Sequence, residues 1–204
     1  SNHDSFAGDR LMDATQLNGN EAQYRLAAAT YLLQPGTPFI YYGEEIGMRS
    51  AANLSGDPKL RTPMSWAGDA KAGFTTGTPF RALSANAATN NVAAQGADPN
   101  SLLNFYKAVI AVRRAHPSLM AGTQAAAVAS GTTLSFQRVQ GAERAVVMIN
   151  YGTATANITA AGLVANATLV NAFPSSGTDT TADAGGSATV SVPAQSVRVF
   201  ITGS

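Results

Sequence analysis

Two periodicities divide the chain, and one gives way to the other near His116-Pro117. Over Glu21–Leu33, apolar and aromatic residues recur at helical spacing, after the capping run Asn18-Gly19-Asn20 and before Pro35-Gly36. The pattern therefore predicts a helix between these signals. A second apolar stripe follows Asp98-Pro99, a predicted helix cap, and ends at His116-Pro117, which predicts a second helix.

The segment between these helices has two parts. Thr37–Tyr42 is short, apolar on both faces and bounded by glycines, which predicts a buried strand of a parallel sheet. Residues 47–97 are rich in Gly, Asn, Ala and Thr and show little periodicity, so they are expected to be loops. A long irregular stretch in a compact domain is unusual unless it lines a functional surface.

From residue 119 onward the period falls to two. Leu134 and Phe136 alternate with polar neighbours, and similar alternation follows around residues 145–150, 189–192 and 197–201. Turn residues separate these runs, so the pattern predicts an antiparallel β-sandwich over residues 119–204. The low-complexity stretch 174–188 is expected to be a flexible hairpin loop, because a strand pattern follows it.

Composition narrows the classes of function. The 204 residues carry a formal charge of +1 without a basic stripe, which argues against nucleic acid as a partner. There is no cysteine, hence no disulfide or thiolate metal site, and no apolar run approaches the roughly 18 residues of a membrane span. Only 12% of residues are charged, which suits a secreted or periplasmic protein with a neutral sugar substrate.

Four motifs follow one another in a fixed order. They are Ser1-Asn2-His3-Asp4, Gly36–Met48 (GTPFIYYGEEIGM), Arg61–Trp66 (RTPMSW) and Arg113–Leu119 (RRAHPSL). Together they resemble the end of the catalytic barrel of the α-amylase family, glycoside hydrolase family 13. The third motif is similar to that of the α-glucosidase and trehalose-synthase-like branch.

The resemblance implies a fold of class α/β plus all-β: the last portion of a (β/α)8 TIM barrel followed by a C-terminal antiparallel β-sandwich. Residues 1–118 would run from the end of barrel strand 7 to helix 8, and residues 119–204 would form the sandwich. About 250 residues make such a barrel, so this chain cannot close one. The family's nucleophile and acid/base lie on barrel strands 4 and 5, which are not in this chain.

The resemblance also assigns roles to three residues. Asp4 corresponds to the family's third catalytic carboxylate, which grips sugar hydroxyls and stabilises positive charge in the transition state. His3 is expected to bind the same sugar. Arg61 is a substrate-binding candidate that could instead brace the loop near the active site. Read as bare terminal residues, His3 and Asp4 would have no function.

Other residues of these motifs are interpreted as structural. Glu44 and Glu45 are adjacent on the predicted strand and would point to opposite faces, so they cannot form a catalytic pair. Tyr41 and Tyr42 are expected to fill the barrel core. Trp66 could stack on a sugar or pack within its loop.

The resulting hypothesis is a piece of a retaining α-glycoside hydrolase acting on starch, malto-oligosaccharides or α-glucosides, and inactive by itself. No cofactor is expected in this chain, although the full-length parent could hold calcium. The expected partners are an α-glucan substrate and either the missing N-terminal part or a second copy. Two alternatives stay open: a non-catalytic carbohydrate-binding or interaction module, and a trehalose-synthase-like transglycosylase parent.

Overall fold

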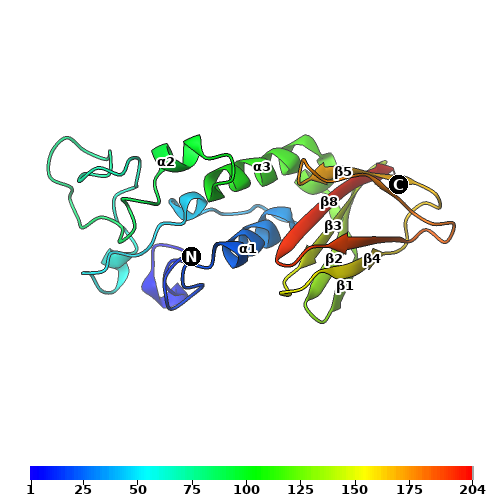
Figure 1. Ribbon diagram of the computed structural model, residues 1–204, viewed down its shortest axis with the longest axis horizontal. Coiled ribbons are helices and arrows are strands. Elements are labelled where there is room, and N and C mark those ends of the chain that lie inside the picture. Colours follow the sequence, from blue (N-terminus) through cyan, green and yellow to red (C-terminus); the bar gives the residue numbers. More distant parts are fainter. Residues whose placement is uncertain (204) are drawn as a thin grey trace. The chain divides into compact units, whose positions relative to one another are not determined.

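The computed structural model describes residues 1–203, which divide into two compact units. Unit 1 comprises Ser1–Tyr24 and Phe39–Lys107, and unit 2 comprises Arg25–Pro38 and the residues from Ala108 onward. Figure 1 traces the chain through both. The domain boundary that the sequence predicts between residues 118 and 119 stays a prediction.

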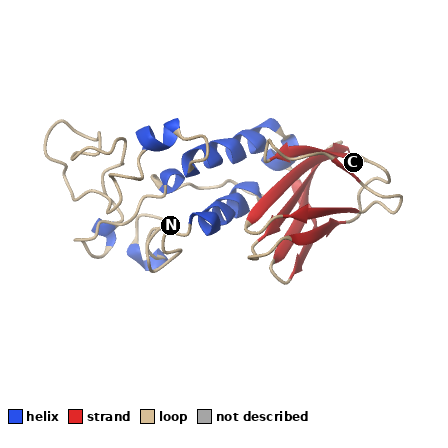
Figure 2. Ribbon diagram, viewed as in Figure 1, coloured by secondary structure: helices blue, strands red, loops and turns tan. Residues whose placement is uncertain are grey.

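Helices lie mainly in the first part of the sequence and strands in the last part (Figure 2). The α-helices are α1 (Glu21–Leu33), α2 (Val92–Ala97), α3 (Leu102–Ala115) and α4 (Pro117–Ala121). Three 3-10 helical turns are η1 (Ser5–Ala7), η2 (Glu44–Ile46) and η3 (Asp57–Lys59). The strands are β1 (Thr123–Ser130), β2 (Thr133–Gln140), β3 (Glu143–Asn150), β4 (Ala156–Ala160), β5 (Thr168–Phe173), β6 (Thr180–Thr181), β7 (Ala188–Val192) and β8 (Ser196–Gly203).

Both long helices predicted from the sequence are confirmed. The Asn20 side chain accepts a hydrogen bond from the Gln23 amide at 3.1 Å and caps α1. The cap of α3 differs from the prediction. Ser101 Oγ accepts from the Asn104 amide at 3.2 Å, whereas the Asp98 carboxylate accepts from the amide of Asn100, before the helix begins.

Side chains of unit 1 bond to its irregular backbone and pack into a buried core. One buried apolar cluster of the unit consists of Ile46, Met48, Met64 and Leu103, with Val92 packed against it. The carboxamides of Asn90 and Gln95 both donate to the Ile46 carbonyl, at 3.1 and 2.8 Å. The predicted loop over residues 47–97 is therefore an ordered connection, and it contains η3 and α2, which the sequence did not predict.

The strand predicted over Thr37–Tyr42 is wrong for this chain. Within residues 1–203 the segment is irregular and pairs with no strand. It is not buried either, since Phe39 is 87% exposed. Tyr41 and Tyr42 do not fill a core here: each donates its hydroxyl to the Leu60 carbonyl, and Tyr42 also donates to that of Thr62. An apolar sequence favours a strand, but only a neighbouring strand supplies the hydrogen bonds.

Unit 2 contains two antiparallel sheets. Six strands form the order β1-β2-β3-β8-β5-β6, and β4 pairs with β7 in a second sheet. The sequence prediction of antiparallel strands from the period of two is confirmed for β2, β3, β7 and β8. The two sheets contribute to one buried cluster, which includes Met148, Phe200, Ile158, Ala188 and Val192.

The other phenylalanines of unit 2 are also buried. Phe136 is 1% and Phe173 9% exposed, as the interpretation of both as core residues requires. Phe136 lies on β2, which α4 contacts along with β3. The large sheet is therefore covered by α4 over part of its length.

Two buried arginines bind the carboxyl end of α1 without any carboxylate partner. Arg113 donates to the carbonyls of Leu32, Gln34 and Gly36. Arg138, which is 1% exposed, donates through Nη1 to the Leu33 carbonyl at 3.0 Å; its Nε and Nη2 donate to Gly122, at 3.1 and 2.8 Å.

These cations sit where the helix dipole is negative, and they satisfy carbonyls that the helix leaves unpaired. Burial lowers the pKa of both guanidinium groups, and Arg113 adds to the effect at Arg138.

Glu143 at the start of β3 anchors the start of α4. Its Oε1 accepts from the Ser118 amide and hydroxyl at 2.8 and 2.6 Å, and its Oε2 lies 3.2 Å from His116 Nδ1. Burial opposes ionisation, but the hydrogen bonds from Ser118 and His116 outweigh it, so the pKa of Glu143 lies below its ordinary value. Ser118 is fully buried and donates to the carboxylate, which makes this group a structural anchor rather than a nucleophile.

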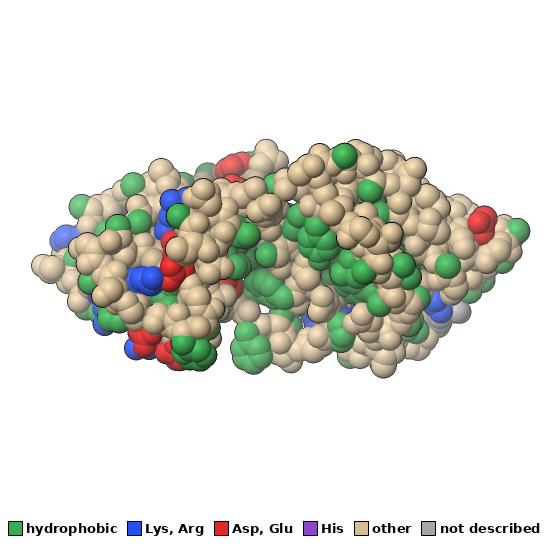
Figure 3. All heavy atoms as spheres, turned by 90° about the horizontal axis from the view of Figure 1, so that it is seen from below, with side chains coloured by type: hydrophobic (Ala, Val, Ile, Leu, Met, Phe, Trp, Pro, Cys, Tyr) green, Lys and Arg blue, Asp and Glu red, His purple; other side chains and the backbone are tan. Residues whose placement is uncertain are grey.

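On the face drawn in Figure 3, more acidic and basic side chains are visible on unit 1 than on unit 2. No helix within residues 1–203 is long and apolar enough to cross a membrane.

Candidate functional site

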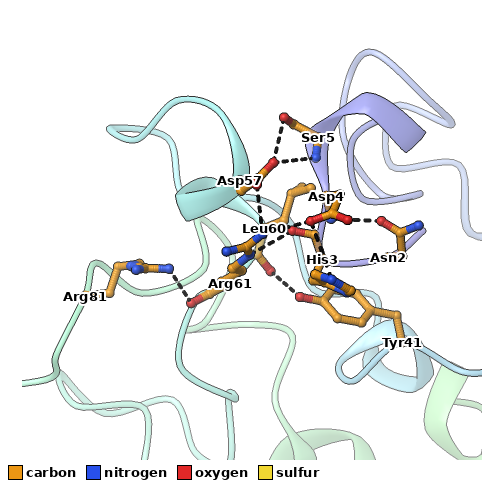
Figure 4. A network of polar contacts seen from close by, with 9 residues as sticks. All are labelled: Asn2, His3, Asp4, Ser5, Tyr41, Asp57, Leu60, Arg61 and Arg81. Atoms are coloured by element: carbon orange, nitrogen blue, oxygen red, sulfur yellow. Dashed lines mark hydrogen bonds and ion pairs between the residues drawn. The ribbon is translucent and has the colours of Figure 1, made fainter.

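Segments far apart in the sequence of unit 1 meet at Arg61. The amino-terminal residues lead into η1, and η3 places Asp57 one turn before Arg61 (Figure 4). The guanidinium donates through Nη2 to Asp4 Oδ1 at 2.8 Å and to Asp57 Oδ2 at 2.7 Å. Its Nε donates to the His3 carbonyl at 2.8 Å. The structure thus brings together all three residues that the sequence proposed for the site.

Asp4 is held at one oxygen only. Its Oδ1 accepts from Arg61 and lies 3.4 Å from His3 Nε2, while Oδ2 has no hydrogen-bond partner among residues 1–203. The side chain of Asp4 is 33% exposed and that of His3 64% exposed. One carboxylate oxygen and the imidazole therefore remain accessible to a ligand.

Asp57 is a member of this network that the sequence reasoning missed. Its Oδ1 accepts from the backbone amide and the hydroxyl of Ser5, at 2.8 and 2.9 Å. These two hydrogen bonds, and then the Arg61 charge, hold the pKa of Asp57 below its ordinary value. A carboxylate four residues before an arginine forms an i, i+4 pair, a signal that could have identified Asp57.

Behind the network lies a second arginine, Arg10, which is 1% exposed. It donates to the carbonyls of Tyr42 and Leu60 at 2.9 and 2.8 Å, and its guanidinium carbon lies 4.9 Å from the ring centroids of both Tyr41 and Tyr42. Such cation–π geometry is favourable for a desolvated cation. Arg10 thereby fixes the backbone of Leu60 beside Arg61.

Tyr41 stays protonated over the physiological pH range. Burial and the neighbouring Tyr42 raise its pKa to about 12, with Arg10 and Arg61 acting in the opposite direction. Its hydroxyl can therefore act as a constant donor to the Leu60 carbonyl.

Glu44 and Glu45 lie on η2 rather than on a strand. Glu44 is buried and accepts from Ser1 Oγ at 2.6 Å and from the Tyr41 amide at 3.2 Å. Burial raises the pKa of Glu45, whose Oε2 is enclosed and has no hydrogen-bond partner among residues 1–203. The geometry gives Glu44 the structural role that was expected.

A site for a metal ion is not evident in the described part of the chain. Within residues 1–203, no three carboxylate or imidazole side chains come close enough together to hold one. The network around Arg61 offers hydrogen-bond acceptors and negative charge to a polar ligand instead.

Comparison with known proteins gives a match to a family model over more than half of the chain. Residues 1–122 match the alpha-amylase catalytic domain. The trehalose synthase/amylase TreS of Mycobacterium tuberculosis is 38% identical over 122 residues, which cover 56% of this chain and 20% of that protein. A probable oligo-1,6-glucosidase of Bacillus subtilis is 33% identical over 145 residues, covering 52% of this chain and 26% of its own length.

A solved structure is similar over almost the whole chain. The isomaltulose synthase SmuA of Protaminobacter rubrum superposes with a TM-score of 0.76 over 99% of this chain and 42% of its own. At 21% identity this similarity shows the fold alone. The chain thus spans less than half the length of these similar proteins.

Proposed function

Because the chain belongs to the α-amylase family of glycoside hydrolases and transglycosylases, we propose that it supplies the transition-state-stabilising carboxylate, Asp4, to an active site for α-glucans or α-glucosides. The nucleophile and acid/base of that site come from residues that this chain does not contain. The chain alone is accordingly inactive. The observation that carries the proposal is the Arg61–Asp4 pair, which fixes one carboxylate oxygen and leaves the other available.

The chemistry of retaining glycosidases explains why a third carboxylate is useful. Two carboxyl groups about 5–5.5 Å apart act as nucleophile and acid/base, and positive charge develops on the sugar ring in the transition state. The Asp4 carboxylate is paired with Arg61 through one oxygen, and its other oxygen can accept hydrogen bonds from sugar hydroxyls. His3, next to it, donates to the same sugar, and Arg61 positions both residues.

The finer architecture belongs to the same proposal. Residues 1–118 form the end of a (β/α)8 barrel, and residues 119–204 form a C-terminal β-sandwich. The unpaired segment Thr37–Tyr42 then finds its neighbouring strands in the rest of the barrel. Exposed Phe39 supports this, because a large apolar side chain on an unpaired segment favours association. Docking to the missing part, or self-association, would cover it.

The first experiment measures binding of methyl α-glucoside to the 204-residue chain by calorimetry. Asp4→Asn removes the charge that the sugar meets, and it is expected to weaken binding by about tenfold or more. Asp98→Asn is the matched control, since Asp98 is exposed and accepts only from its own turn. Equal affinity of Asp4→Asn and wild type would contradict the proposal.

A second measurement tests catalysis directly. The chain is incubated with maltose and with aryl α-glucosides, and no turnover is expected because the nucleophile and acid/base are absent. Robust hydrolysis by this chain alone would show that catalysis lies elsewhere.

Two alternatives have distinct signatures. A trehalose-synthase-like transglycosylase parent is supported by the 38% identity to a trehalose synthase/amylase. That parent would form trehalose, whereas a hydrolase releases only glucose from maltose. A non-catalytic binding module would bind maltoheptaose with an affinity that Asp4→Asn leaves unchanged.

A further inference from the structure

Unit 1 exposes three aromatic side chains on the loop formed by residues 66–81. Trp66 is 50%, Phe74 41% and Phe80 67% exposed. The rings of Phe74 and Phe80 lie in contact, with centroids 5.8 Å apart and planes inclined by 54°. Isolated exposed aromatics are common on proteins, but a pair held together in water presents a continuous apolar surface.

The loop that carries this pair is pinned by its own backbone. The amides of Trp66 and Ala67 both donate to the Ala72 carbonyl, at 2.8 and 3.0 Å. Gly73 then turns with a φ of +60°, and a Cβ there would lie 3.1 Å from that of Ala67. Because the loop is already closed before a ligand arrives, little ordering is needed on binding.

Arg81 connects the aromatic pair to the Arg61 network. Its Nη1 donates to the Arg61 carbonyl at 3.3 Å, a contact drawn in Figure 4. Its guanidinium carbon also lies 5.5 Å from the Phe80 ring centroid. A single side chain therefore links Phe80 to the backbone of Arg61, the residue whose guanidinium holds Asp4.

We propose that Phe74 and Phe80 form a platform for a second or third glucosyl ring of an α-glucan whose first ring lies at Asp4. This inference rests on the proposed function. A glucosyl ring carries an apolar C–H face and a rim of hydroxyls, so it stacks on an aromatic face while its rim stays hydrated. Arg81 covers one face of Phe80, and the sugar takes the other.

The test compares two sugars on the full chain. Maltotetraose reaches the platform, whereas methyl α-glucoside has a single ring and stays at Asp4. Affinities are measured by calorimetry. The emission of Trp66, the single tryptophan of the sequence, serves as a second readout close to Gly73.

Phe74→Ala and Phe80→Ala are each expected to raise the Kd for maltotetraose by about fivefold to tenfold, from the lost contact of one half-buried ring. The Kd for methyl α-glucoside should not change. Phe39→Ala is the matched control, because Phe39 is an aromatic residue of unit 1 that is 87% exposed. Phe80→Leu keeps the apolar bulk without an aromatic face, and it should weaken maltotetraose binding as well.

The outcomes separate the two proposals. If the platform variants bind maltotetraose as wild type does, while Asp4→Asn loses methyl α-glucoside, the platform is refuted and the proposed function stands. If both sugars bind and only Asp4→Asn has no effect, the proposed function fails and the platform stands as a binding surface. Absence of binding of either sugar by the wild-type chain overturns both.

Discussion

Replacement of Arg138 by methionine tests how the end of α1 is held in unit 2. The substitution keeps an apolar chain of similar length and removes all three N–H donors that reach Gly122 and Leu33. Two buried carbonyls then lose their partners, at about 1–3 kcal/mol each. Removing a desolvated cation offsets part of this destabilisation, since burial already disfavours the charged form of Arg138. The expected net destabilisation is about 2–4 kcal/mol.

The assay is urea unfolding followed by far-ultraviolet circular dichroism, which reports on the strands. Arg114→Met is the matched control: it removes the same charge from an exposed site and should stay within about 0.5 kcal/mol of wild type. Arg138→Lys keeps a charge that cannot span both carbonyls, so it should fall between the two. If Arg138→Met is as stable as Arg114→Met, the carbonyl bonds contribute nothing and the reasoning is refuted.

Three further predictions concern single positions. Glu143→Gln should lose less stability in acid than wild type does. Because the pKa of Glu143 is lowered in the folded state, its contribution to stability is present above about pH 4.5 and is lost as pH falls through the folded-state pKa. Melting temperatures measured from pH 7 to 3 test this, and the same pH dependence in both proteins would contradict it. Gly186→Ala should lower the free energy of unfolding in urea by about 2–4 kcal/mol, because φ is +74° and a Cβ would lie 2.3 Å from the Leu163 carbonyl oxygen. Gly185→Ala is its control, since Gly185 has neither a positive φ nor a backbone atom that close. Asn20→Ala should lower the free energy of unfolding by about 1 kcal/mol, because it removes a helix cap. A loss of helicity on melting that matches that of wild type would argue against this role.

Local signals predicted the local elements well. The sequence predicts α1 over its observed residues, because a capping run, an apolar period of helical spacing and a terminating Pro-Gly all point to the same segment. Strands β2, β3, β7 and β8 follow from alternation. The short helix α2 was missed because six residues are too few to show a period, although its cap Asn91, which accepts from the Ala94 amide, was a usable sign.

Features that depend on distant contacts were harder to foresee. Thr37–Tyr42 has a strand's composition, but pairing is a property of two segments, and no segment within residues 1–203 pairs with it. Arg10 and Arg138 look like surface residues in the sequence, yet both are 1% exposed. Their acceptors are backbone carbonyls, which every residue carries, so no sequence pattern marks such a contact.

At the candidate site, the motif match supplied His3, Asp4 and Arg61, and the structure placed them within reach of one another. The motif match did not reveal that two carboxylates share the Arg61 guanidinium. Asp57 shares the same Nη2 as Asp4, so its contribution became visible only in three dimensions.

That shared arginine has a consequence for inhibitors. One guanidinium faces two carboxylates, Asp4 and Asp57, so with neutral His3 the group carries a formal charge of −1. A sugar mimic with a ring nitrogen that is protonated at neutral pH would meet an uncompensated negative charge, whereas its uncharged carbon analogue would not. The preference for the charged compound should weaken as salt concentration rises, because all three side chains are partly open to water.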